Sequence, residues 1–169
     1  MDDKMIESIE KSLEKGGKDA VLAVVEQVRE IGVPQMIPTL VSVYKTCGDD
    51  EIKMAIFKLL SDNSNQAAAD IMCDLIGEED DINVKQMLVT TCWYSKISYI
   101  DRLEMFIDMV IEAPFELAFE AFTVIENQQT MVTDVRKEEL LEYIGKNMEK
   151  VQVANEALAS GLSEVIKNY

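Results

Sequence analysis

The sequence contains no histidine and only three cysteines. The absence of histidine excludes Ser-His and Cys-His nucleophile pairs, and it removes the commonest general base and zinc ligand. The cysteines Cys47, Cys73 and Cys92 form no CxxC motif, and their odd number favours reduced thiols over a disulfide framework. Each lies in a helical pattern beside apolar residues, so we expect buried small hydrophobic side chains.

Proline and glycine are also scarce, with three and seven residues in a chain of 169. This composition suits helices that are joined by short turns. No apolar run approaches the roughly 18 residues that a membrane-spanning helix needs. The charged start Met1-Asp2-Asp3-Lys4 differs from that of a signal peptide. We therefore expect a cytoplasmic protein that has no membrane as a partner.

Basic residues are outnumbered by acidic ones, 16 against 32, which gives a net charge of −16. Such a chain is repelled by the nucleic-acid backbone and by anionic lipid, so neither is expected as the main partner. Residues 49–126 hold 17 acidic and 5 basic residues, whereas the segments before and after them each carry a net charge of −2. Two interpretations remain open: solvated helix faces, or a surface for a basic partner.

Carboxylates occur in two arrangements that resemble sites. Glu78-Glu79-Asp80-Asp81 is a run of four, but it lacks the spacing and central glycine of an EF-hand, so we expect a solvated turn. Glu116 and Glu120 are spaced i, i+4, and on an exposed helix such a pair repels mildly without catalysing a reaction. We predict no catalytic residue, no metal site and no cofactor.

Apolar residues recur with helical spacing along the whole chain. The pattern predicts helices over 3–15, 51–62, 65–77, 82–95, 115–127 and 153–168, one between Asp19 and Gly32, one from Pro34, one from Ser98 or Asp101, and one from Asp134 to about Lys150. Asp19 and Asp134 are expected as N-caps, and so is Asp49 or Asp50. Ile31 and Met148 are expected to be buried. Gly161 suggests close backbone packing.

The expected helix at 115–127 is apolar on two sides. One side carries Phe115, Ala118, Phe119, Phe122 and Ile125, and the other carries Leu117, Ala121 and Val124. This pattern predicts a helix that is sandwiched between neighbours.

The second helices of three successive pairs begin with comparable strings. Ile52, Val84 and Phe115 take matching places, 32 and then 31 residues apart, which indicates stacked helical repeats. The pairs resemble HEAT-like repeats of the α-solenoid family. The residues that carry the resemblance are Ile37-Pro38-Thr39-Leu40 in a first helix, and Asp50-Glu51-Ile52-Lys53 and Ile82-Asn83-Val84-Lys85 at the start of second helices. The third pair departs from the pattern, because Phe115-Glu116 replaces the apolar-basic pair.

The resemblance implies an all-α, right-handed superhelix of four or five antiparallel helix pairs, in one domain over 1–169. Residues 1–33 and 129–169 would be capping pairs around core repeats at 34–128. Family members act mostly as scaffolds and adaptors, which implies a non-catalytic protein-binding role here. The alternative is an enzyme or enzyme subunit, similar to HEAT-like lyases that act on phycobilin pigments or to HEAT-like DNA-repair proteins. The repair version needs a basic cleft, and this chain has the opposite charge. A buried carboxylate in a deep pocket would favour catalysis. An irregular helical bundle is a third possibility.

In HEAT-like solenoids the second helices line the inner, concave surface, so the resemblance implies binding on an acidic concave face, and residues of these helices outside the apolar stripe are candidates for partner binding. They are Met54, Lys58 and Ser61; Gln86, Thr90 and Tyr94; and Glu116, Glu120, Thr123 and Asn127. The alternative is an ordinary solvated surface. Tyr94 and Tyr99 either anchor a partner or cover the edge of the core. The predicted partner is a protein with a segment rich in lysine and arginine; the sequence indicates neither its identity nor the oligomeric state.

Overall fold

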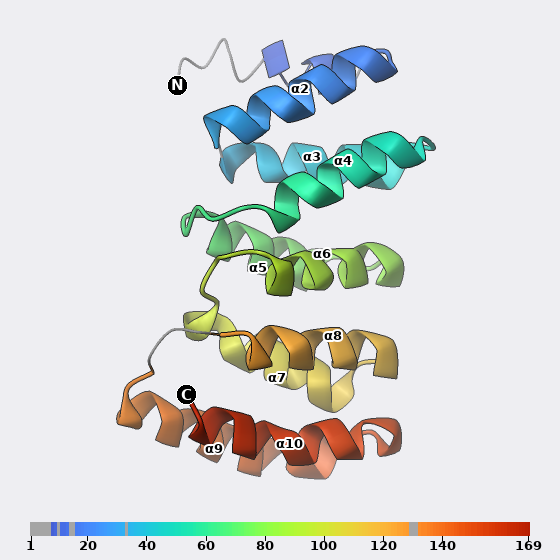
Figure 1. The fold of residues 1–169 in the computed structure, drawn as a ribbon. Coiled ribbons are helices and arrows are strands. Elements are labelled where there is room, and N and C mark those ends of the chain that lie inside the picture. The colour runs from blue at the N-terminus through green and yellow to red at the C-terminus, as the bar shows by residue number, and fades with distance from the viewer. Residues whose placement is uncertain (1–7, 10, 14–15, 33, 129–131) are drawn as a thin grey trace. The chain divides into compact units, whose positions relative to one another are not determined.

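The computed structural model describes residues 8–9, 11–13, 16–32, 34–128 and 132–169 (Figure 1). All regular secondary structure within these ranges is helical, which confirms the all-α prediction. The chain forms two compact units. Unit 1 comprises residues 1–79 and 94–97, and unit 2 comprises residues 80–93 and 98–169.

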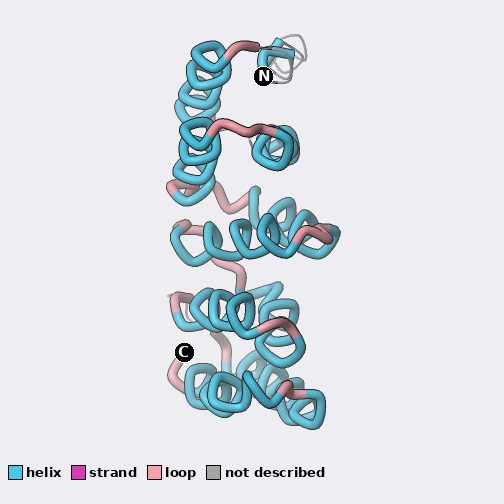
Figure 2. The backbone as a smooth tube through the Cα atoms, turned by 90° about the vertical axis from the view of Figure 1, so that its right-hand side faces the viewer, coloured by secondary structure: helices cyan, strands magenta, loops and turns pink. Residues whose placement is uncertain are grey.

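Unit 1 is built from two layers of helices with short connections (Figures 1 and 2). Its described elements are α2 (Lys18–Ile31), the 3-10 turn η1 (Pro34–Met36), α3 (Ile37–Thr46), α4 (Asp50–Ser61) and α5 (Ala68–Glu78). Helix α2 packs against α4, and α3 packs against both α4 and α5. The helices that pack side by side therefore alternate along the chain, as they do where helix pairs are stacked.

Unit 2 contains α6 up to Trp93 and all the helices after it. Its elements are α6 (Ile82–Tyr94), η2 (Ile100–Arg102), α7 (Leu103–Glu112), α8 (Phe115–Glu126), α9 (Asp134–Asn147), η3 (Met148–Lys150), η4 (Val153–Asn155) and α10 (Glu156–Lys167). Helix α7 packs closely against α8 and also contacts α9, while α10 contacts α7, α8 and α9. The pair α7–α8 thus packs on the pair α9–α10.

Local sequence signals explain most helix ends in unit 1. Gly32 follows α2 in the left-handed conformation, with φ of 67°, and its N–H bonds the carbonyl of Val28. Pro38 lies in the first turn of α3, where it leaves the helix unbroken. The Asp49 carboxylate accepts bonds from the first N–H groups of α4, which confirms it as the N-cap.

Other predicted ends were wrong. Asp19 lies inside the first turn of α2, and Gly17 precedes the helix without a side-chain cap. Thr133, and not Asp134, caps α9, because its hydroxyl accepts the N–H of Arg136. The helix predicted to start at Ser98 or Asp101 begins as the 3-10 turn η2 at Ile100 and continues as α7 from Leu103.

The predicted core is largely confirmed. Four of the valines of α2 and the aliphatic residues predicted for α3, α4 and α7 are buried, although Ala55 and Tyr44 are only half-buried. Ile31 and Met148 are exposed, contrary to prediction: Ile31 is the last residue of α2, and Met148 directly follows α9. Residues of the predicted helix at 3–15 are described only in part, and there Ile9 and Leu13 are buried.

Gly161 lies against an aromatic ring, as its position in an apolar stripe suggested. A Cβ atom built on Gly161 would lie 3.3 Å from Cζ of Phe122. The absence of a side chain therefore lets α10 approach α8 closely within unit 2.

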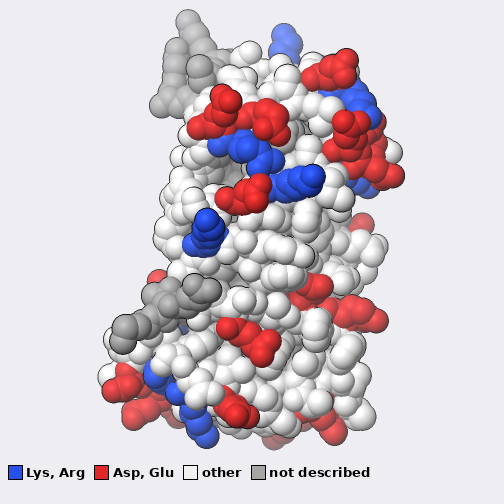
Figure 3. Space-filling view, viewed as in Figure 1, with Lys and Arg blue, Asp and Glu red and all other residues white. Residues whose placement is uncertain are grey.

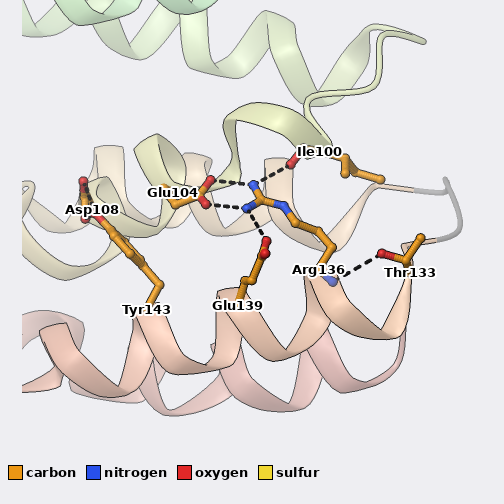
Figure 4. Close-up of polar contacts among 7 residues, drawn as sticks. All are labelled: Ile100, Glu104, Asp108, Thr133, Arg136, Glu139 and Tyr143. Carbon is orange, nitrogen blue, oxygen red and sulfur yellow. Dashed lines mark hydrogen bonds and ion pairs between the residues drawn. The ribbon is translucent and has the colours of Figure 1, made fainter.

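Helices α7 and α9 are joined by a polar cluster (Figure 4). The guanidinium of Arg136 donates to both oxygens of Glu104, at 2.6 and 2.7 Å, and to the carbonyl of Ile100 at 3.2 Å. One turn along, the Tyr143 hydroxyl contacts both oxygens of Asp108. Burial, together with the Asp108 hydrogen bond, raises the pKa of Tyr143 to about 12. The cluster fixes how the two pairs of unit 2 pack.

Candidate functional site

The exposed side of α8 is the surface of unit 2 that combines large apolar side chains with carboxylates. We define the α8 surface by six residues: Phe115, Glu116, Phe119, Thr123, Glu126 and Asn127. Phe115 and Phe119 are 47% and 52% exposed, and their ring centroids lie 6.4 Å apart. Their predicted burial was therefore wrong. The two rings are neighbours and therefore form one exposed apolar patch, a feature that can mark a binding surface.

The sequence of α8 explains this exposure. The buried residues are Leu117, Ala118, Ala121, Val124 and Ile125. Their spacing of i, i+1, i+4, i+7 and i+8 is that of one complete apolar stripe, which faces the rest of unit 2. Phe115 and Phe119 lie beyond the edge of the stripe, and Phe122 lies nearest to it and is half-buried against Gly161. The two-sided pattern was thus one stripe with an aromatic edge.

Trp93 connects the predicted residues of α6 with those of α8. Its indole N–H donates to the Glu120 carboxylate at 2.6 Å. Trp93 and Glu120 are both half-buried, so this bond forms the border of the α8 surface on the side of α6. Trp93 was predicted only to be partly buried, and nothing in the sequence signals that it pairs with a carboxylate 27 residues away.

The α8 surface is acidic. Helix α8 has three glutamates and no basic residue, and over α8 Figure 3 shows red side chains set in white surface. Within the described part of the chain, Glu116 and Glu126 form no ion pair. Some other glutamates of unit 2 do have a basic partner, as in Glu104–Arg136 and Glu142–Lys146. Uncompensated negative charge therefore coincides with exposed aromatic rings.

The remaining predicted residues of unit 2 make local bonds. The hydroxyl of Thr90 donates to the carbonyl of Gln86, and that of Thr123 donates to the carbonyl of Phe119. The amide of Asn127 donates to the carbonyl of Thr123. Gln86, Thr90 and Thr123 are half-buried, whereas Asn127 is exposed. These groups keep acceptor oxygens at the surface, and none forms a catalytic arrangement.

The predicted residues of unit 1 lie on a smaller surface of their own. Met54 and Lys58 are exposed on α4, whereas the hydroxyl oxygen of Ser61 is buried, so Ser61 was wrongly predicted to face a partner. Tyr94 is exposed and packs edge-to-face against Phe57, with ring centroids 6.0 Å apart. Tyr99, by contrast, is buried in unit 2 and covers the core, so it does not anchor a partner.

Glu79 is the buried carboxylate among the described residues, with 7% of its surface exposed. The expectation of a solvated turn at 78–81 is therefore wrong for Glu79. It lies in a groove of about 320 Å³ between α3 and the end of α5. Both of its oxygens lie 2.9 Å from the ammonium of Lys45. This geometry joins α3 to the end of α5 and leaves Glu79 poorly placed for general acid catalysis.

We expect Lys45→Met to lower the free energy of unfolding by about 1.5 kcal/mol, because it leaves the buried Glu79 carboxylate without its ammonium partner. Urea titration followed by far-ultraviolet circular dichroism measures this. Lys58→Met removes an exposed lysine from the next helix and is the matched control, with an expected loss below about 0.5 kcal/mol. Equal losses in the two variants would show that the Lys45–Glu79 pair contributes nothing.

Among the described residues, no group of three or more histidine, cysteine or acidic side chains is arranged to hold a metal ion. None of the three cysteines, all of which are described, forms a disulfide; Cys73 and Cys92 are buried, and Cys47 is half-buried. In the same part of the chain, no helix has both the length and the apolar character needed to cross a bilayer.

Comparison of the chain with protein-family models, with curated proteins and with solved structures gives no match in any of the three. The resemblance to HEAT-like repeats therefore stays a prediction from the sequence, and the candidate site is argued from its own geometry.

Proposed function

We propose that this chain is a non-catalytic scaffold that binds a protein segment rich in lysine and arginine on the exposed sides of its second helices. The α8 surface is the main binding site. The observation that carries the proposal is the coincidence there of two exposed phenylalanines with glutamates that form no ion pair within the described chain. Aromatic rings supply apolar contact area, and the carboxylates supply charge complementarity.

The architecture we propose is a HEAT-like solenoid of four or five helix pairs, with capping pairs at 1–33 and 129–169. Packing inside each unit supports it. In unit 1, α2 contacts α4 and α3 contacts α5; in unit 2, α7 contacts α9 and α8 contacts α10. Each helix thus packs against the one two places along the chain, as in stacked pairs. The three cysteines form no disulfide, which is consistent with a reducing compartment, and we propose the cytoplasm.

Binding should depend strongly on salt. Trp93 is the only tryptophan and borders the α8 surface, so its fluorescence reports a peptide that lacks tryptophan. We expect an amphipathic basic peptide to bind about tenfold more weakly when ionic strength rises from about 0.1 M to about 1 M, because the Debye length falls from about 10 Å to about 3 Å. Affinity that does not change with salt would contradict the electrostatic basis of the proposal.

A pair of charge-matched variants locates the binding site. Glu116→Gln with Glu126→Gln removes two carboxylates from the α8 surface, and we expect about fivefold weaker binding at low salt. Glu138→Gln with Glu142→Gln removes the same charge from the exposed side of α9, and we expect less than a twofold change. Equal weakening by the two pairs would indicate a general charge effect and would reject α8 as the site.

One observation could favour the enzyme alternative: the Glu79 carboxylate is buried and lies in a groove. Catalysis by this group would require an oxygen that is available to a substrate. Both oxygens contact the Lys45 ammonium, which supports a structural ion pair. We therefore do not propose a catalytic function.

A further inference from the structure

The α8 surface places an aromatic ring next to a carboxylate at helical spacing. Phe119 follows Glu116 by three residues, so the two side chains are neighbours on the same exposed side of the helix. Both are exposed, and Phe115 lies beside them one turn earlier. A side chain of a partner that lies along α8 would contact a ring and a carboxylate together.

The two rings form an apolar platform. Their planes are inclined by only 33° at a centroid distance of 6.4 Å, so the two rings have similar orientations. In an edge-to-face pair, such as Tyr99 with Phe106 in the core, one ring covers the other. On α8 the pair is tilted and not edge-to-face, and about half of each residue is exposed to solvent, which leaves apolar area for a planar group.

Glu116 is the carboxylate of α8 that is best placed to bond a group stacked on these rings. Glu120, one turn further on, already accepts the indole N–H of Trp93. Glu126 lies two turns beyond Phe119, on the far side of the ring. Within the described residues Glu116 has neither an ion pair nor a hydrogen bond to another side chain, so both of its oxygens can accept from a partner.

We infer that the α8 surface binds an arginine side chain of its partner in preference to lysine, with the guanidinium lying over the Phe119 ring and donating to Glu116. A guanidinium is planar and weakly hydrated, and it stacks on a ring while its N–H groups bond a carboxylate in two places. An ammonium is compact and strongly hydrated, and it cannot do both. This inference rests on the proposed function, because it specifies the partner of the same surface.

The test uses two capped peptides of equal length and charge that lack tryptophan. One has arginine and the other has lysine at every basic position. We expect the arginine peptide to bind the full chain at least about fivefold more tightly, as measured by Trp93 fluorescence. Phe119→Leu keeps an apolar side chain and removes the ring, and we expect the two peptides then to bind alike. Val135→Ala shortens an exposed apolar side chain on α9, outside the α8 surface, so it is the control and should keep the preference.

Each outcome separates the inference from the function on which it rests. Equal, salt-dependent binding of both peptides to the unaltered chain overturns the arginine inference and leaves the proposed function standing. No binding of either peptide overturns both. A preference that persists in Phe119→Leu overturns the assignment of the guanidinium to this ring. Urea unfolding of each variant confirms that it remains folded.

Discussion

Phe106→Ala should lower the free energy of unfolding of unit 2 by about 4 kcal/mol, because the substitution removes a fully buried ring and leaves a cavity. Phe106 is completely buried on α7 and packs edge-to-face against Tyr99, with ring centroids 5.7 Å apart. A loss of this size is a large part of the total stability of about 5–15 kcal/mol that is typical of a domain. Urea unfolding followed by Trp93 fluorescence measures it, since Trp93 belongs to unit 2.

The matched control is Phe119→Ala, which deletes the same atoms from a half-exposed ring on the next helix. We expect it to cost less than about 1 kcal/mol, because Phe119 is 52% exposed and its truncation leaves no buried cavity. The same variant should weaken binding of an arginine-rich peptide. Phe106→Ala would then lower stability, whereas Phe119→Ala would mainly weaken binding. Comparable destabilisation by both substitutions would mean that Phe119 is part of the core.

The contrast between these rings shows where the sequence was informative. Phe106 belongs to the apolar stripe Leu103, Phe106, Ile107 and Val110. Helical periodicity places these residues on a single face, so the burial of Phe106 was predicted correctly. In α8 eight of twelve residues are apolar, so periodicity permits more than one buried side. The side of α8 that is buried is the one with Ala118 and Ala121, because small residues let α7 and α8 approach closely. The phenylalanines were left outside it.

The helix ends follow the same logic. Asp49 was predicted as a cap from a turn and a following apolar run, and its carboxylate bonds two N–H groups of α4. Asp134 has the same local signal, but Thr133 occupies the cap because α9 begins one residue earlier than expected. Boundaries of this kind depend on how the preceding segment enters the helix, which local residue preferences do not determine.

Contacts between helices were the part that could not be predicted. The pairs Lys45–Glu79, Trp93–Glu120 and Arg136–Glu104 join residues 27 to 34 positions apart. These separations are close to the spacing of 31 or 32 residues that the sequence predicts for a repeat. A repeat brings equivalent positions of successive pairs together, but charge pairing at such a distance has no local signal in one sequence. The candidate residues on α6 and α8 were predicted, whereas the bond that joins the two helices was not.

Arg136→Met should destabilise unit 2 by about 3 kcal/mol, because it removes a bidentate partner from the partly buried Glu104 carboxylate and a donor from the carbonyl of Ile100 (Figure 4). Arg136→Lys should lose about half as much, since an ammonium cannot form both parallel bonds. Glu139→Gln is the control. Its carboxylate is exposed and lies 3.5 Å from Arg136, so we expect a loss below about 0.5 kcal/mol. Trp93 fluorescence in urea reports all three.

The pH dependence of the Arg136 effect identifies its cause. Burial alone would raise the pKa of Glu104, but the hydrogen bonds and charge of Arg136 outweigh it and lower the pKa below the usual 4.5. Because the folded-state pKa is the lower one, the pair contributes its full stability above pH 4.5 and loses it as pH falls through the folded-state value. The difference in unfolding free energy between the unaltered chain and Arg136→Met should therefore shrink in acid. A difference that stays constant to the lowest pH would assign the loss to the packing of the Arg136 alkyl chain and not to the ion pair.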